Sequence, residues 1–80
     1  MTITVKLFAS LGKYLPPGSQ GRTATLTVAD GATVGSVLAA LGVPQAAAHL
    51  IMVNGAHRTW DTPLADGDTL TVFPPVAGGA

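Results

Sequence analysis

The sequence predicts a small α+β domain, with a mixed sheet of four to five strands and one main helix packed on one face. Two observations predict this class. Strand-like apolar segments lie near both ends of the chain and in its second half, and they enclose one helical segment. Apolar residues also make up 48% of the 80 residues, so one helix and one sheet can form a core.

Composition and charge exclude several classes of protein. Charged residues make up 10% of the chain and cysteine is absent, so disorder, disulfides and a thiol nucleophile are not expected. Four basic and four acidic residues cancel, which does not favour a nucleic-acid partner. The apolar runs are far shorter than the ~20 residues that cross a bilayer, and the first residues lack a signal-peptide pattern. We therefore expect a cytoplasmic protein without a nucleic-acid or membrane partner.

Residues 2–8 and 22–28 are predicted to form the first two strands. Residues 2–8 alternate in hydropathy, with apolar side chains at positions 3, 5 and 7, as in a strand with one buried face. The prolines and glycines of residues 9–21 indicate a loop between the strands. We expect Leu11, Tyr14 and Leu15 to attach this loop to the core.

One amphipathic helix is predicted to start at Val34. Apolar residues at positions 34, 37, 38 and 41 have helical spacing. Thr33 is a suitable N-cap. Gly42 is suited to the residue that ends the helix, and Pro44 prevents its continuation.

The second half is predicted to form three strands, over residues 50–53, 56–60 and 69–73. Asn54-Gly55 is a strong signal for a two-residue hairpin, whereas residues 46–48 indicate at most a helical turn. The helix then crosses over between two hairpins. This order is typical of a β-grasp, the ubiquitin-like arrangement, in which the first and last strands lie parallel in the middle of the sheet.

The last seven residues form a segment of a different kind, so we predict a domain over residues 1–73 and an extended, flexible tail over 74–80. Pro74 and Pro75 cannot donate ladder hydrogen bonds, so the sheet must end there. They also favour a stiff, extended exit. Beyond them the side chains are small, and Gly78 and Gly79 have none. Such a tail is suited to entering a narrow slot in another protein.

The phases of the strands predict an apolar patch beside the exit of this tail. Phe8 and Phe73 are out of phase with the core residues of their strands, and parallel neighbours would place both at one end of the sheet. A two-residue turn would pair Met52 with His57 on the same open face. Several apolar residues at one end indicate a partner surface.

An internal active site is not expected. His49 and His57 lack metal-ligand spacing, no serine has an evident base to activate it, and Trp60 is expected to be a packing residue. A terminal carboxylate could still react after adenylation, because the mixed anhydride has a good leaving group that sulfur or an amine can displace. Glycine adds no bulk there. We therefore expect that the protein is not an enzyme and binds no cofactor. We expect it to be a substrate of other enzymes instead.

Motifs along most of the chain fit one known family. They are Phe8-Ala9, Gly31-Ala32-Thr33-Val34, Val53-Asn54, Asp61 with Pro63-Leu64, Asp66-Gly67-Asp68 and Val72-Phe73-Pro74-Pro75-Val76-Ala77-Gly78-Gly79. Together they resemble the MoaD/ThiS family of ubiquitin-like sulfur carriers, most closely its MoaD branch. The ending Phe-Pro-Pro-Val-x-Gly-Gly is specific, whereas Gly-Gly alone is not.

The resemblance implies that Gly79 is adenylated by an E1-like adenylyltransferase that uses ATP, and then becomes a thiocarboxylate. A sulfurtransferase or cysteine desulfurase system would supply the sulfur. In the MoaD branch the sulfur serves molybdopterin biosynthesis, on a large, MoaE-like synthase subunit. It also implies that Gly78 lies next to Gly79 in the tunnel of the partner, as part of the reactive end, and that Phe8 and Phe73 contact partners. The full set of residues that we expect to bind a partner is Phe8, Met52, His57, Phe73, Pro74, Pro75 and Val76.

Two positions depart from the family pattern. His57 stands where an apolar residue is often found. Ala80 follows the second glycine, at which the family usually ends, and moves Gly79 away from the reactive position. Either Ala80 is a cloning remnant or an altered codon, or a metalloprotease removes it before activation. The second case resembles carriers that serve amino-acid or secondary-metabolite pathways.

Four functions remain open. The leading one is a sulfur carrier for molybdopterin or a related pterin cofactor. The others are a sulfur carrier for cysteine, homocysteine or thiamine biosynthesis, a protein modifier joined through Gly79 to lysines, and a ubiquitin-like binding module that uses the Phe8/Phe73 face.

Overall fold

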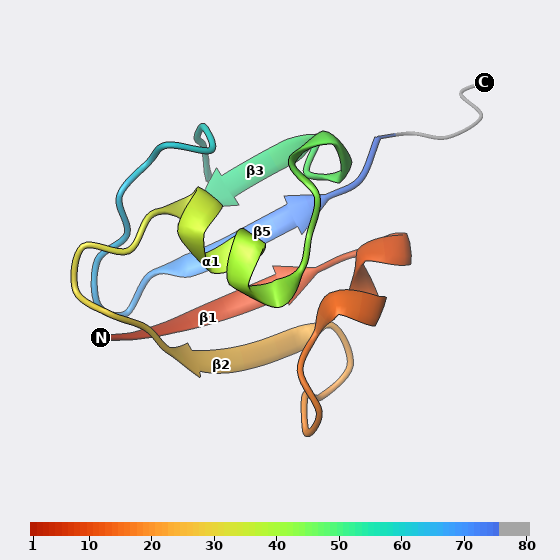
Figure 1. Ribbon diagram of the computed structural model, residues 1–80, viewed down its shortest axis with the longest axis horizontal. Helices are drawn as coiled ribbons and strands as arrows, with labels where there is room; N and C mark the ends of the chain where they lie inside the picture. The colour runs from red at the N-terminus through yellow and green to blue at the C-terminus, as the bar shows by residue number, and fades with distance from the viewer. Residues whose placement is uncertain (76–80) are drawn as a thin grey trace.

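A computed structural model of the chain describes residues 1–75. Helix α1 lies across one face of a single sheet, and two 3-10 helices lie in the connections (Figure 1). The predicted α+β architecture with one main helix is therefore confirmed. The elements are β1 (Thr2–Leu7), η1 (Ala9–Tyr14), β2 (Thr23–Thr27), α1 (Val34–Leu41), η2 (Gln45–Ala47), β3 (Leu50–Val53), β4 (Ala56–His57) and β5 (Thr69–Phe73).

The sheet has the order β2-β1-β5-β3-β4. Its two central strands, β1 and β5, run parallel, and Leu7 lies opposite Val72. The other neighbouring strands pair antiparallel. The first and last strands thus lie side by side in the middle, and this confirms the predicted β-grasp arrangement.

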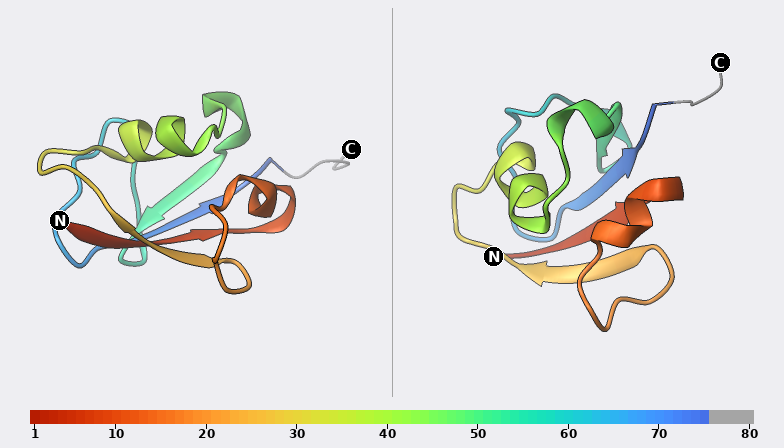
Figure 2. Two further views of the ribbon diagram at one scale, coloured as in Figure 1. Left: turned by 60° about the horizontal axis from the view of Figure 1, so that its bottom comes forward. Right: turned by 45° about the vertical axis from the view of Figure 1, so that its right-hand side comes forward.

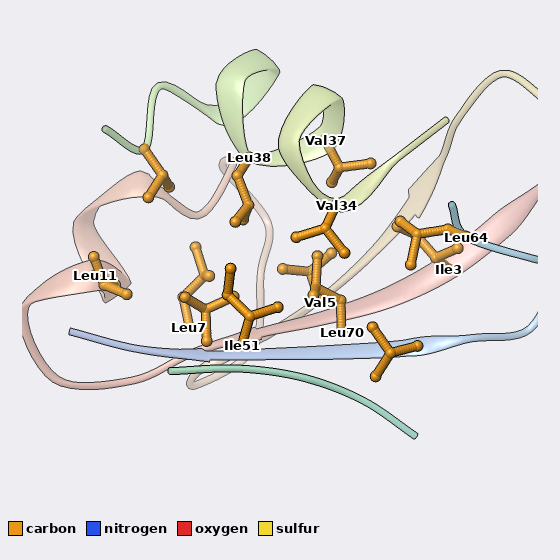
Figure 3. Packing of buried hydrophobic residues seen from close by; sticks show 13 residues of the cluster. Ile3, Val5, Leu7, Leu11, Val34, Val37, Leu38, Ile51, Leu64 and Leu70 are labelled. Carbon is orange, nitrogen blue, oxygen red and sulfur yellow. The ribbon is translucent and has the colours of Figure 1, made fainter. Parts of the chain in front are cut away.

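The core lies between α1 and one face of the sheet (Figure 3). Alternate residues of each strand point toward the helix, as the period of two requires. The side chain of Val34 projects from α1 toward Val5, and that of Leu38 projects toward Leu7 and Ile51. Leu11 from η1 closes one end, which confirms that the first loop is attached to the core. The buried cluster is Ile3, Val5, Leu7, Leu11, Val34, Val37, Leu38, Val43, Ile51, Val53, Leu64, Leu70 and Val72.

Both ends of α1 follow the local sequence. The Thr33 hydroxyl accepts a hydrogen bond from the Ser36 N–H at 3.1 Å, and the Thr33 N–H donates to the Ser36 hydroxyl at 2.9 Å. This reciprocal capping satisfies backbone donors that have no partner within the helix. Gly42 ends the helix with φ of 87°, a left-handed conformation that costs glycine little. The predicted start at Val34 and the end at Gly42 are confirmed.

The predicted fourth strand over residues 56–60 is wrong in length. Ladder pairing stops at His57, and the chain then turns at Thr59–Thr62, where the Thr59 N–H donates to the Thr62 hydroxyl at 3.2 Å. The Trp60 carbonyl accepts a hydrogen bond from Gly35 at 2.8 Å. The segment is therefore drawn toward the start of α1 rather than along β3.

Two other parts of the chain differ in detail from the prediction. The loop after β1 contains the six-residue helix η1. Alternation over residues 22–28 predicts Ala24, Leu26 and Val28 on the core face, but Leu26 and Val28 are only half-buried, because β2 is an edge strand of the sheet. The chain leaves the sheet at Pro74 and Pro75. The rest of the predicted tail, including Val76, lies outside the described residues.

Candidate functional site

Phe8 and Phe73 stack on each other at the end of the two central strands. Their ring centroids are 4.6 Å apart and the ring planes differ by 8°. The parallel register causes this contact, because Leu7 pairs with Val72 and the Phe8 N–H donates to the Val72 carbonyl at 3.1 Å. Neighbouring strands lie about 4.8 Å apart, which is the spacing of stacked rings. The predicted meeting of the two phenylalanines is confirmed.

Arg22 adds a third layer to this stack. Its guanidinium carbon lies 5.8 Å from the centroid of the Phe8 ring, within the range of a cation–π interaction. The Arg22 carbonyl accepts a hydrogen bond from Leu7 at 3.0 Å, so pairing of β1 with the start of β2 positions the residue. Sequence analysis missed Arg22. The sequence could have indicated this position. Because the second strand was expected to pair with the first in a hairpin, the residue at its start must lie beside the end of β1.

Met52 and His57 pair with each other across β3 and β4, as predicted. Their position relative to the aromatic pair is not as predicted. Met52 lies opposite Thr71 on β5, whereas Leu50 lies opposite Phe73. Leu50 is therefore the β3 neighbour of the aromatic pair, and Met52 and His57 lie farther along the sheet. The antiparallel register of β3 on β5 decided this, and hydropathy alone does not specify it.

An apolar hollow of about 620 Å³ lies where the tail leaves the fold. The last ladder bond before it joins the His49 N–H to the Phe73 carbonyl at 3.1 Å. The hollow is lined by Ala9, Ser10, His49, Leu50, Phe73, Pro74 and Pro75. Figure 2 shows the chain leaving the sheet at the end that carries η1. The predicted reactive residues Gly78 and Gly79, and Ala80 after them, lie outside the described residues.

The described part of the chain offers few groups for chemistry of its own. The Ser19 hydroxyl donates to the Pro16 carbonyl at 2.6 Å and the Ser36 hydroxyl to the Thr33 carbonyl at 3.0 Å, so both are engaged with backbone. His49 is exposed. Among residues 1–75, three or more His, Cys, Asp or Glu side chains do not come together as a metal site. No helix in this part is long and apolar enough to cross a membrane.

Asp68 connects the two turns at the opposite end of the sheet. Its carboxylate accepts hydrogen bonds from the Ala65 N–H at 2.8 Å and from the Asn54 side-chain amide at 2.8 Å. The Asn54 side-chain oxygen accepts from the Thr69 N–H at 2.9 Å. These bonds, chiefly the one from the Ala65 backbone, hold the pKa of Asp68 below its usual value and outweigh the opposing effect of burial. The cluster is structural, since every bond stays within the turns.

Solved structures with the same fold support a common ancestry. The crystal structure of SAMP1 from Haloferax volcanii aligns with a TM-score of 0.70 and 27% identity, over 99% of this chain and 100% of that one. Another structure, of the H. volcanii small archaeal modifier protein 1, aligns with a TM-score of 0.71 and 30% identity, over 94% of this chain and 98% of that one. No curated protein sequence matches the chain.

A third structure links the chain to the predicted family. It is a Pyrococcus furiosus protein provisionally assigned as molybdopterin converting factor, subunit 1, with a TM-score of 0.70 and 26% identity, over 94% of this chain and 98% of that one. The resemblance to MoaD-type ubiquitin-like proteins is thereby confirmed. A family model described as Mut7-C ubiquitin matches residues 1–78. This ubiquitin-like β-grasp chain, with a fold shared by sulfur carriers and protein modifiers, therefore belongs to the Mut7-C ubiquitin family.

Proposed function

We propose that the protein is a sulfur carrier that works through Gly79, and that its sulfur serves the biosynthesis of molybdopterin or a related pterin cofactor. One observation carries the proposal. The run Pro74-Pro75-Val76-Ala77-Gly78-Gly79 follows β5 without a turn in the sequence, and it starts beside the half-buried Phe8/Phe73 stack. A partner can therefore hold the aromatic pair and receive the glycines at the same time.

Adenylation supplies the activation that a carboxylate lacks. The Gly79 carboxylate attacks the α-phosphorus of ATP on an E1-like adenylyltransferase, pyrophosphate leaves, and an acyl adenylate forms. A thiol reduces the persulfide of a sulfurtransferase or cysteine desulfurase system, a disulfide forms and sulfide is released. The sulfide then attacks the acyl carbon. A C–S bond forms, the C–O bond to AMP breaks, and AMP leaves with the electron pair. The product is a thiocarboxylate that can give its sulfur to an acceptor and return to a carboxylate.

The body of the protein serves to present this end. Two prolines restrict the start of the tail and lower the entropy lost when it enters a slot. Glycines at the tip let the backbone of a partner approach closely. The Phe8/Phe73 stack and the adjacent hollow offer apolar area for the adenylyltransferase and for a large, MoaE-like synthase subunit. The protein acts in this scheme as a substrate and donor, not as an enzyme.

Ala80 must be removed before this chemistry can occur at Gly79. Cleavage of the Gly79–Ala80 peptide bond, by a metalloprotease in our proposal, would leave the glycine carboxylate free. The small side chains on both sides of that bond leave it unhindered. This step would place the carrier under the control of a protease.

Modification of proteins is a second candidate function. It is favoured by the 30% identity to small archaeal modifier protein 1 of H. volcanii. The acyl adenylate would then react with a lysine amine of a target instead of sulfide, and an amide would form. A sulfur carrier for cysteine, homocysteine or thiamine biosynthesis would use the same chemistry as our main proposal with a different acceptor.

Mass spectrometry with the E1-like enzyme of the same organism tests these proposals. Three forms are incubated with ATP and a sulfur source: the 80-residue chain, a form that ends at Gly79, and a form that ends at Ala77. We expect only the form ending at Gly79 to gain the mass that replaces one oxygen by sulfur. Thiolation of the 80-residue chain as it stands would overturn the processing step. Failure of the Gly79 form to be adenylated would overturn the carrier, and lysine conjugates in cells would favour the modifier.

A further inference from the structure

The charged residues of this electrically neutral chain are separated along its length. Three of the four basic residues lie toward the end of the fold at which the tail leaves, and the acidic residues lie elsewhere. Lys6 precedes Phe8 by one strand period, Lys13 lies in η1, and Arg22 directly precedes β2. Figure 1 shows η1, the start of β2 and the exit of the tail at one end of the long axis. The net charge is zero, but the positive and negative side chains lie in different parts of the domain, so the domain has an electric dipole.

The acidic residues are held at the other end of the sheet or beside the start of α1. Asp66 accepts a hydrogen bond from the Thr2 N–H at 2.7 Å, and Asp30 lies 3.5 Å from the N-terminal amine. Asp68 is bonded within the neighbouring turns. Asp61 lies in the turn that hydrogen-bonds the first residues of α1. None of these carboxylates is placed to neutralise the basic residues at the tail end.

Of the two basic residues at that end that lie over an aromatic ring, Arg22 is the one on the Phe8/Phe73 pair, whereas Lys13 Nζ lies 5.3 Å from the centroid of the Tyr14 ring. The stack on Phe8 restricts the Arg22 guanidinium near one edge of the aromatic pair, and its side chain is exposed. In the described residues, the single ion pair is the one between Asp30 and the N-terminal amine. The forked donors of Arg22 are thus available to an outside acceptor, and a planar guanidinium suits the two oxygens of a carboxylate.

We propose that the partner of the tail-end surface is a protein whose docking surface has an apolar centre and an acidic rim, with one carboxylate that binds Arg22. The tail-end surface is defined as Phe8, Arg22, Leu50 and Phe73. The inference rests on the proposed function for the identity of that partner, the E1-like adenylyltransferase. Charge complementarity would orient the carrier, so that the tail end meets the enzyme first.

A protein partner fits this surface better than a nucleic acid. The centre of the surface is an aromatic stack and an apolar hollow of about 620 Å³, which apolar side chains of a partner can fill. The basic residues are few and lie at its margin, whereas nucleic-acid binding depends on many phosphate contacts. The opposite charge of the other end would also repel a long polyanion.

Binding to the E1-like adenylyltransferase without ATP, measured by calorimetry at about 0.01 M and about 0.15 M salt, tests the proposal. We expect Arg22→Glu to weaken binding about tenfold at the lower salt concentration and by less at the higher one. Arg22→Lys keeps the charge but loses the planar guanidinium with its forked donors, so a smaller loss is expected. Arg58→Glu is the matched control, because it makes the same change of charge on an exposed residue beyond β4 and should alter Kd by less than about twofold.

Two outcomes would overturn the proposal. One is equal binding of the Arg22→Glu and parent forms, provided that thermal unfolding shows both to be folded. The other is binding of a DNA oligonucleotide as tight as that of the enzyme at about 0.15 M salt, with the same dependence on Arg22. The binding assay does not require thiolation of Gly79. A failure of the carrier chemistry therefore remains distinguishable from a failure of the acidic-partner proposal.

Discussion

Trp60 lies directly over Gly35, with no room for a side chain between them. A Cβ added at Gly35 would lie 2.5 Å from Cδ1 of the indole and 2.8 Å from its Cε2. The Gly35 N–H also donates to the Trp60 carbonyl, so the ring and the backbone approach the helix together. This contact explains how the turn after β4 packs on the first turn of α1, and it confirms Trp60 as a packing residue.

Substitution of Gly35 by alanine should therefore destabilise the domain. Alanine favours a helix by up to about 1 kcal/mol over glycine, but displacement of the indole is expected to cost more, about 1–3 kcal/mol. With the full helical gain, we expect a net loss of up to about 2 kcal/mol in the free energy of unfolding, measured by denaturant titration. Gly12→Ala is the control, since a Cβ there meets no atom within 4 Å. Equal stability of the two variants would mean that Trp60 moves aside without cost.

The second prediction concerns the hydrogen bonds between Thr33 and Ser36 that cap the start of α1. Thr33→Ala removes the hydroxyl that accepts from the Ser36 N–H, which should lower the free energy of unfolding by about 1 kcal/mol. Thr33→Ser keeps the hydroxyl and should lose only a few tenths of that amount. If thermal unfolding ranks the two variants alike, the cap contributes little to stability.

The depressed pKa of Asp68 predicts a loss of stability in acid. The folded state favours the ionised carboxylate, so its contribution is complete above the unfolded pKa of about 4. The contribution is lost as the pH falls through the lower folded pKa. Asp68→Asn should therefore lower stability at pH 7 and reduce its fall between about pH 5 and pH 2. Denaturant titrations across this pH range measure the effect, and Asp61→Asn, at an exposed residue, is the control. If Asp68→Asn kept the pH profile of the parent protein, as the control should, Asp68 would not be a source of the acid loss of stability.

The tail-end surface can be tested without the tail chemistry. Phe8→Ala removes one ring of the stack, and because Phe8 is half-buried we expect a loss of only about 0.5–1.5 kcal/mol in stability from the stack itself. Binding to the E1-like enzyme should weaken at least about tenfold, as for an aromatic residue at the centre of an interface.

Met52→Ala distinguishes the observed surface from the predicted one. Met52 lies opposite Thr71 rather than Phe73, so its substitution should affect binding less than Leu50→Ala does. Calorimetry on the folded variants would compare them directly. A larger effect of Met52 than of Leu50 would show that the partner covers the middle of the open face and not its tail end.

The local sequence by itself determined the parts of this protein that depend on neighbouring residues. The Thr33 cap, the Gly42 stop and the Asn54-Gly55 hairpin each act within a few positions, so their residue types suffice to predict them. Alternation along β1 and β5 assigned each side chain to a face, and the parallel pairing of these strands then placed Phe8 beside Phe73. The prolines and glycines after Phe73 predicted a tail for the same reason: backbone restrictions are local.

Tertiary structure alone decided what depends on contacts between distant segments. The contact of Trp60 with Gly35 drew the chain away from β3 after His57, and the register of β3 on β5 placed Leu50, not Met52, beside the aromatic pair. Arg22 reached the Phe8 ring only because β2 pairs with β1. Each of these contacts joins residues at least 14 positions apart, and hydropathy specifies which face a residue occupies but not which distant residue lies opposite it.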